Sequence, residues 1–290
     1  MVRPILGVIG GSGLYDLPGL AVEREERVAT PWGEPSDALR FGRVGDTQCV
    51  FLARHGRGHR HAPGSINYRA NFDALKRVGV TDVIAMSACG SYREDLPPGT
   101  FVIVDQFVDR TYARETSFFG AGCVAHVPMA RPVSPGLARR LAAAAAHEGV
   151  PHHFGGTYVC MEGPQFATMA EAHANRANGW HVVGQTAGSE ARLAREAELP
   201  YALCAMVTDF DCWSEAHASV DVATVVRTAR ENAGKANRLL VRALLGFGAE
   251  REPCPVADHA LDGAIMTSPD ARDPALLAKL DAVAGRVLRG

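Results

Sequence analysis

Several features that would place this 290-residue chain in other protein classes are absent. Its formal net charge is −2 with 11 histidines, so it has no basic field for a phosphate backbone and no acidic tail, and we expect no nucleic-acid partner. No apolar run is long enough to span a membrane, and the first residues lack the layout of a signal peptide. We therefore expect a cytoplasmic protein without a membrane partner.

Signals for metals and cofactors are also lacking. The 7 cysteines form no C-x-x-C pair, so neither a disulfide framework nor a zinc site is indicated, and most should fill core positions. The loop Gly10-Gly11-Ser12-Gly13 misses the third glycine of a dinucleotide fingerprint, because Asp16 stands in its place, and no Lys-Ser/Thr pair completes a P-loop. No nucleophile elbow or Ser-His-Asp spacing supports covalent hydrolysis. We expect no metal and no cofactor.

What the chain does contain is an alternation of apolar, β-branched runs with helix-forming stretches. Because 290 residues without a visible linker can bury one large core, we expect one α/β domain over residues 1–290, with helices flanking a mixed central β-sheet. The expected strands are 5–9, 49–52, 82–86, 101–104, 158–160, 181–183 and 201–207. The expected helices are 67–77, 135–148, 169–178, 190–198 and 220–245.

The last segment, Pro274 to Leu288, has leucines and valines on roughly one face, which predicts an amphipathic helix. A stretch rich in proline and aspartate, near Ser268 to Pro274, precedes it. We therefore expect this C-terminal helix, about residues 274–288, to dock away from its own core, on a neighbouring subunit.

Two carboxylates, Asp209 and Asp211, follow directly after the apolar run Tyr201 to Val207. Burying such groups costs several kcal/mol unless hydrogen bonds or a shared proton compensate, so carboxylates at the end of a buried strand indicate a ligand site. The alternative is that both aspartates cap the next helix and lie in water, because Asp is a common cap residue.

Groups that can bind an anion follow three of the predicted strands. The glycine loop can present backbone N–H groups, Arg54-His55-Gly56 adds cationic side chains, and Ser87-Ala88-Cys89-Gly90-Ser91 adds hydroxyls. Ligands of open α/β sheets gather at such strand ends. One glycine turn alone indicates little, but the three segments together predict an anion site.

Two further segments carry polar or aromatic groups. His55, His59 and His61 lie among arginines, and so many basic groups disfavour a dication and favour an anionic ligand. For Arg57, Arg60 and His61, a solvated basic loop is the alternative. In Glu162-Gly163-Pro164-Gln165-Phe166 a carboxylate and an aromatic ring flank a rigid turn, so Phe166 can stack on a flat ligand or, as is more common for Phe, lie in the core.

These motifs occur in the order found in the 5'-deoxy-5'-methylthioadenosine phosphorylases of the trimeric purine nucleoside phosphorylase superfamily, and the chain resembles that family over about residues 5–245. The resemblance implies a phosphorylase/hydrolase-like fold, a homotrimer, and a pentosyltransferase that cleaves an N-glycosidic bond with inorganic phosphate as co-substrate. The motifs that carry it are Gly10-Gly11-Ser12-Gly13-Leu14, Thr30-Pro31-Trp32-Gly33-Glu34-Pro35-Ser36-Asp37, Arg54-His55-Gly56, Asn67-Tyr68-Arg69-Ala70-Asn71, Ala88-Cys89-Gly90-Ser91, Asp105-Gln106-Phe107-Val108-Asp109-Arg110-Thr111, Glu162-Gly163-Pro164 and Thr208-Asp209-Phe210-Asp211-Cys212-Trp213.

The resemblance also implies a role for each site residue. The two aspartates would be the catalytic pair, facing N7 and the 6-amino edge of adenine. Phosphate would lie against Ser12, Arg54, His55, Ser87, Ala88 (through its N–H) and Thr186. The base and ribose would lie against Phe166, Ala167, Gln185, Asp209 and Asp211. The 5' substituent would lie against His59, Val222, Val225 and Val226, together with the C-terminal helix of a neighbour.

The chain departs from the family at two of these positions. Gln185 stands where the family usually has a ribose-packing Met, and since Gln can hydrogen-bond, we expect the sugar hydroxyls or the 5' substituent to be held differently. Ala167 stands where the family often has Ser. The valines around the 5' position suit a sulfur-methyl group.

The implied activity is phosphorolysis of 5'-deoxy-5'-methylthioadenosine to adenine and 5-methylthioribose 1-phosphate, in purine and methionine salvage. Gln185 and the valines leave a 5'-halo-5'-deoxyadenosine, fluoro or chloro, as the alternative substrate. A hydrolytic nucleosidase is disfavoured by the predicted phosphate-binding set. A catalytically inactive nucleoside-binding protein is disfavoured by the intact charged site.

Overall fold

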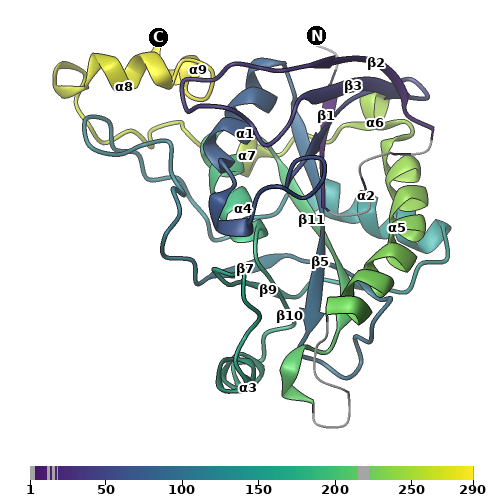
Figure 1. The fold of residues 1–290 in the computed structure, drawn as a ribbon. Helices are drawn as coiled ribbons and strands as arrows, with labels where there is room; N and C mark the ends of the chain where they lie inside the picture. Colours follow the sequence, from purple (N-terminus) through teal and green to yellow (C-terminus); the bar gives the residue numbers. More distant parts are fainter. Residues whose placement is uncertain (1–3, 12–13, 15–16, 18, 215–221, 290) are drawn as a thin grey trace.

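A computed structural model describes the chain apart from residues 1–3, 12–13, 15–16, 18, 215–221 and 290, and without the side chains of Val222 and Glu250. An 11-stranded mixed sheet forms the centre, and helices cover both of its faces (Figure 1). This arrangement confirms the predicted α/β class. Of the helices in the described ranges, none is long and apolar enough to cross a membrane.

The strands predicted from the sequence are all present, with ends that differ by a few residues, and four further strands were not predicted. The strands are β1 (Ile5–Gly10), β2 (Ala21–Glu26), β3 (Leu39–Val44), β4 (Thr47–Ala53), β5 (Asp82–Ser91), β6 (Phe101–Ile103), β7 (Gln106–Asp109), β8 (His152–Phe154), β9 (Thr157–Cys160), β10 (Val182–Gly184) and β11 (Tyr201–Asp209). Of these, β2, β3, β7 and β8 were not predicted; every residue of β2 is exposed, so its sequence lacks the apolar pattern of a buried strand.

Strand β5 is the centre of the sheet. The main order is β2-β3-β4-β1-β5-β10-β9-β7, while β11 pairs with β5 and β6, and β6 also pairs with β8. Strands β4, β1, β5 and β11 run parallel to one another. Their carboxyl ends therefore meet at the same edge of the sheet, which is where ligands of open α/β sheets bind.

The predicted helices are also present, with shifted ends. The helix expected from residue 190 begins at Ala187, so Thr186 becomes the residue that precedes its first turn. Local signals explain the starts of two others: Ser134 precedes a helix with Pro at its first position, and Thr168 forms a capping box with Glu171. The helices are α1 (Tyr68–Arg77), α2 (Pro135–His147), α3 (Met169–Ala177), α4 (Ala187–Glu196), α5 (Val222–Leu244), α6 (Phe247–Glu250), α7 (Pro255–Asp258), α8 (Pro274–Lys279) and α9 (Gly285–Leu288).

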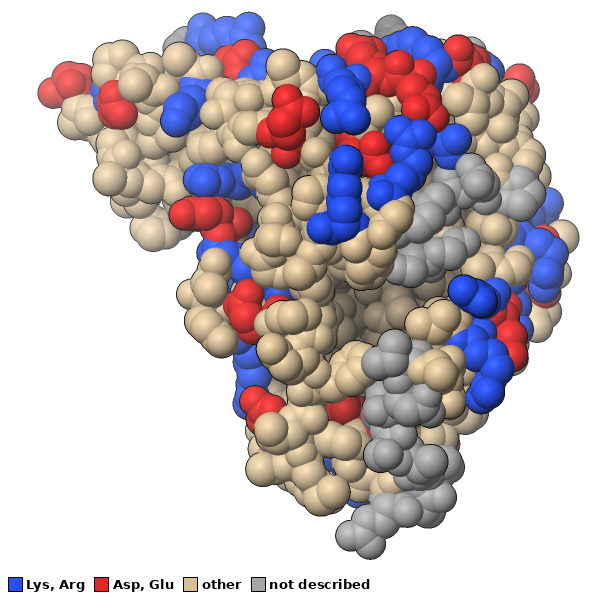
Figure 2. Space-filling view, viewed as in Figure 1, with Lys and Arg blue, Asp and Glu red and all other residues tan. Residues whose placement is uncertain are grey.

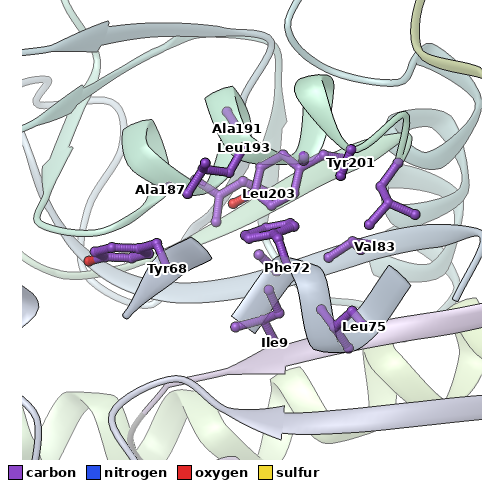
Figure 3. Packing of buried hydrophobic residues seen from close by; sticks show 14 of the residues in the cluster. Ile9, Tyr68, Phe72, Leu75, Val83, Ala187, Ala191, Leu193, Tyr201 and Leu203 are labelled. Carbon is purple, nitrogen blue, oxygen red and sulfur yellow. The ribbon is translucent and has the colours of Figure 1, made fainter. Parts of the chain in front are cut away.

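The core lies on both faces of the sheet, because side chains along a strand alternate between them. In β5, Val83 and Ala85 pack toward α1 and α4, whereas Ile84 and Met86 pack toward α2 and α5. Figure 3 shows the first of these layers, in which Phe72 of α1 lies among side chains of the strands and of α4. As expected, the cysteines are free and all but Cys212 are buried.

The prediction of one continuous helix over residues 274–288 is wrong, because a turn separates α8 from α9. Arg77 of α1 binds the Asp281 carboxylate, and Arg289 donates to the Asp281 carbonyl, which an unbroken helix would pair with the amide of residue 285. Leu280 and Val283 are buried in the chain's own core. Docking of this segment on a neighbouring subunit stays a prediction.

Candidate active site

The predicted site residues meet in one cavity of about 360 Å³. It lies between the sheet edge formed by β5 and β11 and the first half of α5, where Figure 2 shows a hollow in the surface. Ser12 and the side chain of Val222 lie outside the described residues. The other predicted residues all line the cavity: Arg54, His55, His59, Ser87, Ala88, Phe166, Ala167, Gln185, Thr186, Asp209, Asp211, Val225 and Val226.

Arg54 is held by a buried ion pair that the sequence did not predict. Its Nε donates to Glu190 Oε1 at 2.5 Å and its Nη2 donates to Oε2 at 3.0 Å, while Nη1 donates to the Met86 carbonyl at 2.7 Å. Burial opposes the charge on Arg54, but Glu190 outweighs it and raises the pKa of the guanidinium. Among the described residues, two of the five guanidinium N–H groups have no partner and are available to a ligand, and their direction is fixed by Glu190.

Glu190 has a second hydrogen-bond partner, the hydroxyl of Tyr201, which donates to Oε2 at 2.8 Å. Neither residue was singled out in the sequence. A signal was present for Glu190, because a carboxylate on a helix face that also carries Ala187, Ala191 and Ala194 is expected to be buried, and buried carboxylates are paired.

His55 is neutral and can accept a hydrogen bond. Its Nδ1 lies 2.9 Å from the His61 carbonyl, which can only accept, so the proton is on Nδ1 and Nε2 is an acceptor. Burial, followed by the charge of Arg54, lowers the pKa of His55 to about 4. The ring stacks on His59 with centroids 4.2 Å apart. A neutral imidazole with a free acceptor suits a protonated phosphate oxygen rather than a bare anion.

Two hydroxyls and a helix start complete the candidate phosphate subsite. Thr186 precedes α4, and its Oγ1 is buried without a hydrogen-bond partner in the described part of the chain. The Ser87 hydroxyl donates to the Ala88 carbonyl at 3.2 Å, the one bond found for it among the described residues. Ala88 is the one exposed residue of β5. An unpartnered hydroxyl and backbone N–H groups at a helix N-terminus form a favourable environment for an anion.

Arg57 and Arg60 do not line the cavity. Arg57 pairs with Asp37 at 3.2 Å, and Arg60 donates to the Ser36 carbonyl at 2.8 Å. Both side chains are about half exposed. The two arginines are therefore half solvated, as the alternative expected, but they also bind Asp37 and Ser36.

Asp209 and Asp211 are brought together at the end of β11. Thr208 Oγ1 donates to Asp209 Oδ2 at 2.7 Å, and the Asp211 amide donates to Asp209 Oδ1 at 2.8 Å. Burial raises the pKa of both carboxyls, and the charge of Asp209 raises that of Asp211 further. Asp211 Oδ2 is buried and has no hydrogen-bond partner among the described residues.

The capping alternative for these aspartates holds only in part. The short 3-10 helix Asp211–Trp213 has Phe210 at its N-cap without a side-chain cap, although Asp209 does accept the Asp211 amide. Asp211 is 7% exposed, so it does not lie in water. A register shift between Val207 and Asp209 sets Asp209 beside Gly90, whose missing Cβ would otherwise lie 3.0 Å from Asp209 Oδ1.

Phe166 is 49% exposed and lines the cavity, so the core alternative is wrong for this ring. Glu162, in contrast, is a structural residue. Its carboxylate accepts from the amides of Tyr112 and Ala113 at 2.8 and 3.2 Å and from Arg114 Nε at 3.0 Å. Partial burial acts to raise the pKa of Glu162, but these bonds and the charge of Arg114 together outweigh it and lower the pKa.

Part of the cavity lining is apolar. Val225 and Val226 of α5 lie there with Ala229, Pro63 and His59. Val226 is 42% exposed. Within the described ranges, no group of three or more His, Cys, Asp or Glu side chains is arranged to hold a metal ion.

Comparison with known proteins gives a consistent result. The sequence pattern of the phosphorylase superfamily matches residues 5–245. A protein of Bradyrhizobium diazoefficiens named S-methyl-5'-thioadenosine phosphorylase is 60% identical over 100% of both chains, and one of the same name from Cereibacter sphaeroides is 54% identical, also over 100% of both.

Solved structures agree with these relatives. A methylthioadenosine phosphorylase from an antarctic soil metagenomic library superimposes with a TM-score of 0.91 at 39% identity, covering 97% of this chain and 99% of that one. A methylthioadenosine phosphorylase from Schistosoma mansoni in complex with adenine gives a TM-score of 0.85 at 37% identity, covering 93% and 99%.

Proposed function

Because the chain belongs to the phosphorylase superfamily, and within it to the S-methyl-5'-thioadenosine phosphorylases, we propose that it cleaves S-methyl-5'-thioadenosine with inorganic phosphate to adenine and 5-methylthioribose 1-phosphate. The observation that carries the proposal is the single cavity in which anion-binding groups, two buried carboxylates and an apolar wall come together. The reaction needs these three kinds of surface.

Asp209 is the proposed acid for the leaving base. As the bond between C1' and N9 breaks, its electron pair passes into adenine, and negative charge builds on the ring. The raised pKa of Asp209 favours a protonated carboxyl that can give its proton to N7, so that neutral adenine leaves.

Asp211 is proposed to accept a hydrogen bond from the 6-amino group. Its buried, unpartnered Oδ2 requires a donor, which the amino group of adenine supplies. A 6-oxo purine presents an acceptor at the same place and would leave two acceptors facing each other. We therefore propose adenine specificity, with Phe166 stacked on the base.

Phosphate acts at the opposite side of the ribose. One of its oxygens forms the new bond to C1', and its negative charge stabilises the oxocarbenium-like sugar. Arg54, Ser87 and Thr186 would orient it, while neutral His55 would accept from a protonated oxygen. Ser12 and the Ala88 amide complete the proposed set.

The 5' substituent would lie against His59, Val222, Val225 and Val226. A methylthio group matches an apolar wall, and the names of the relatives support it while giving no support to a halogenated substrate.

The test is adenine release from S-methyl-5'-thioadenosine with and without phosphate. We expect release only with phosphate, together with a sugar phosphate detected by mass spectrometry. Release that is independent of phosphate would instead identify a nucleosidase. Adenosine, inosine and 5'-chloro-5'-deoxyadenosine serve as comparison substrates, and a kcat/KM for the chloro compound above that for the methylthio compound would contradict the substrate assignment.

We further propose a cytoplasmic homotrimer, as the family resemblance implies. In it, the exposed side of α8 and α9 would be the part of the C-terminal segment available to a neighbour, because Leu280, Val283 and Ala284 are buried in their own chain. Sedimentation equilibrium should give three times the chain mass, and a monomer at micromolar concentration would contradict the assembly.

A further inference from the structure

The segment Gly163–Phe166 carries the ring proposed to stack on the base, and both of its ends are fixed. Before it, Arg114 donates from Nε to the Glu162 carboxylate at 3.0 Å and from Nη2 to the Met161 carbonyl at 3.3 Å. The Arg114 side chain is 1% exposed, so this anchor belongs to the core. After the segment, Cys212 Sγ lies 3.3 Å from the Ala167 carbonyl, and Thr168 begins α3 with a capping box.

Between these ends, the hydrogen bonds to the segment found within the described chain come from Gln185. Its Nε2 donates to the Gln165 carbonyl at 3.0 Å and to the Pro164 carbonyl at 3.4 Å. The two carbonyl acceptors fix the orientation of the Gln185 amide. If the amide were turned over, its own oxygen would face the two carbonyl oxygens, and no hydrogen bond could form. Gly163 has no side chain where a Cβ would collide with the Gln185 amide. Both N–H groups of Gln185 are thus engaged by the loop and not free for a substrate.

The backbone of Gln185 is fixed as well, by the same arginine that anchors the start of the segment. Its carbonyl accepts from Arg114 Nη1 at 2.6 Å, and it directly precedes Thr186 at the start of α4. The amide therefore connects the candidate phosphate subsite to the tip of the loop that carries Phe166. A side chain without a donor at this position would leave the tip attached only through its two ends.

We infer that Gln185 is a positioning residue: it holds residues 164–165 and thereby keeps the Phe166 ring where it can stack on the proposed base. This inference rests on the proposed function, and it adds a specificity element that the resemblance does not supply, because the family usually has Met there. The effect concerns binding of the adenine ring. Proton transfer from Asp209 and binding of phosphate do not depend on it.

The test is the variant Gln185→Met, which keeps the length of the side chain and removes both donors. The KM for S-methyl-5'-thioadenosine, from steady-state kinetics, and the Kd for adenine, from calorimetry, should both rise about 5- to 30-fold. This is the loss of binding free energy expected when two hydrogen bonds between neutral groups are removed. The kcat and the KM for phosphate should stay within about twofold, since two hydrogen bonds on a half-exposed loop tip contribute little elsewhere. A fall of kcat that accompanies the rise of KM would show a general structural role and overturn the inference. A large loss of thermal stability would do the same.

A double-mutant cycle with Phe166→Ala tests whether Gln185 acts through Phe166. In the Phe166→Ala background, adding Gln185→Met should change the adenine Kd by less than about twofold, because the ring that it positions is gone. Full additivity of the two changes would overturn the inference. Adenine binding needs no turnover, so this result can be read even if the enzyme fails to phosphorolyse S-methyl-5'-thioadenosine.

Discussion

Glu190 binds Arg54 through both carboxylate oxygens, with the two side chains 2% and 1% exposed. The pair supplies a fixed guanidinium to the cavity without an uncompensated charge in the core. The hydroxyl of Tyr201 adds a third bond to Glu190. The orientation of the guanidinium in the candidate phosphate subsite is therefore set by residues buried behind the cavity wall.

Replacing Glu190 with Gln should reduce both stability and phosphate binding. The change leaves Arg54 charged, buried and without its counter-ion, which typically costs about 3–5 kcal/mol in the free energy of unfolding. Urea denaturation measures this loss, and the KM for phosphate should rise at least about tenfold because the guanidinium loses its orientation. As a control, Glu94→Gln removes an exposed pair with Arg176 and should change stability by less than about 1 kcal/mol. Equal effects of the two changes would contradict our interpretation.

Replacing Asp209 with Asn should mainly affect the chemical step. An amide cannot protonate N7, and loss of a general acid typically lowers the rate about 10²–10⁴-fold. We expect kcat to fall by that amount while the thermal midpoint stays close to that of the parent. The matched control is Asp95→Asn, at an exposed aspartate paired with Arg93, which should keep full activity. A kcat for Asp209→Asn near the parent value would remove Asp209 from the mechanism.

His55 should make the folded protein less stable in mild acid. Its pKa is about 4 when folded, lowered by burial and by Arg54, against about 6.5 in an unfolded chain. Between these values the unfolded chain takes up a proton that the folded one refuses, so this contribution is complete above about pH 6.5 and is lost as the pH falls toward 4. Its upper limit is about 3 kcal/mol.

Unfolding in urea at pH 7.5 and pH 5 measures this slope. The variant His55→Gln should show a smaller decrease in stability between the two pH values than the parent. His147→Gln, at an exposed histidine, should keep the parent's slope. Identical slopes for all three proteins would disprove the assignment to His55.

Glu196 should act in the opposite direction. Burial raises its pKa to about 7, although the Phe118 amide and the Ser117 hydroxyl, at 2.7 and 2.8 Å, oppose the rise. Because the folded pKa lies above the unfolded one, this contribution is present in acid and is lost as the pH rises through 7. Glu196→Gln should therefore gain stability relative to the parent on going from pH 5.5 to pH 8, as measured by thermal unfolding at each pH. Glu115→Gln, at an exposed glutamate, is the control, and a parallel shift in that variant would refute the prediction.

Much of the fold and of the site's membership follows from local patterns in the sequence. Buried strands such as β11 carry continuous apolar runs, and Asp209 and Asp211 are visible because they interrupt one of these runs at its end. The resemblance added Thr186 and Gln185, which no local pattern marks. The cavity brings these residues together as expected.

What could not be predicted depends on contacts between distant residues. Glu190 lies 136 positions after Arg54 in the chain, and nothing near either residue specifies the partner. The role of Gln185 was missed for the same reason, since its donors face a loop about twenty positions away. Likewise, amphipathic spacing alone continues through the break between α8 and α9, where Asp281 binds Arg77, a residue far away in the chain.

Strand β5 touches both reacting partners in the proposed complex. Ser87 and Ala88 lie at the phosphate side and Gly90 lies beside Asp209, two residues further along, which corresponds to about 7 Å of extended chain. Since β5 is paired on both sides, this spacing cannot change without disrupting the whole sheet. The valines proposed to line the 5' position lie instead on α5, which is outside the sheet. We therefore expect substitutions on α5 to alter the preference for the 5' substituent without changing the separation between the proposed phosphate and base positions.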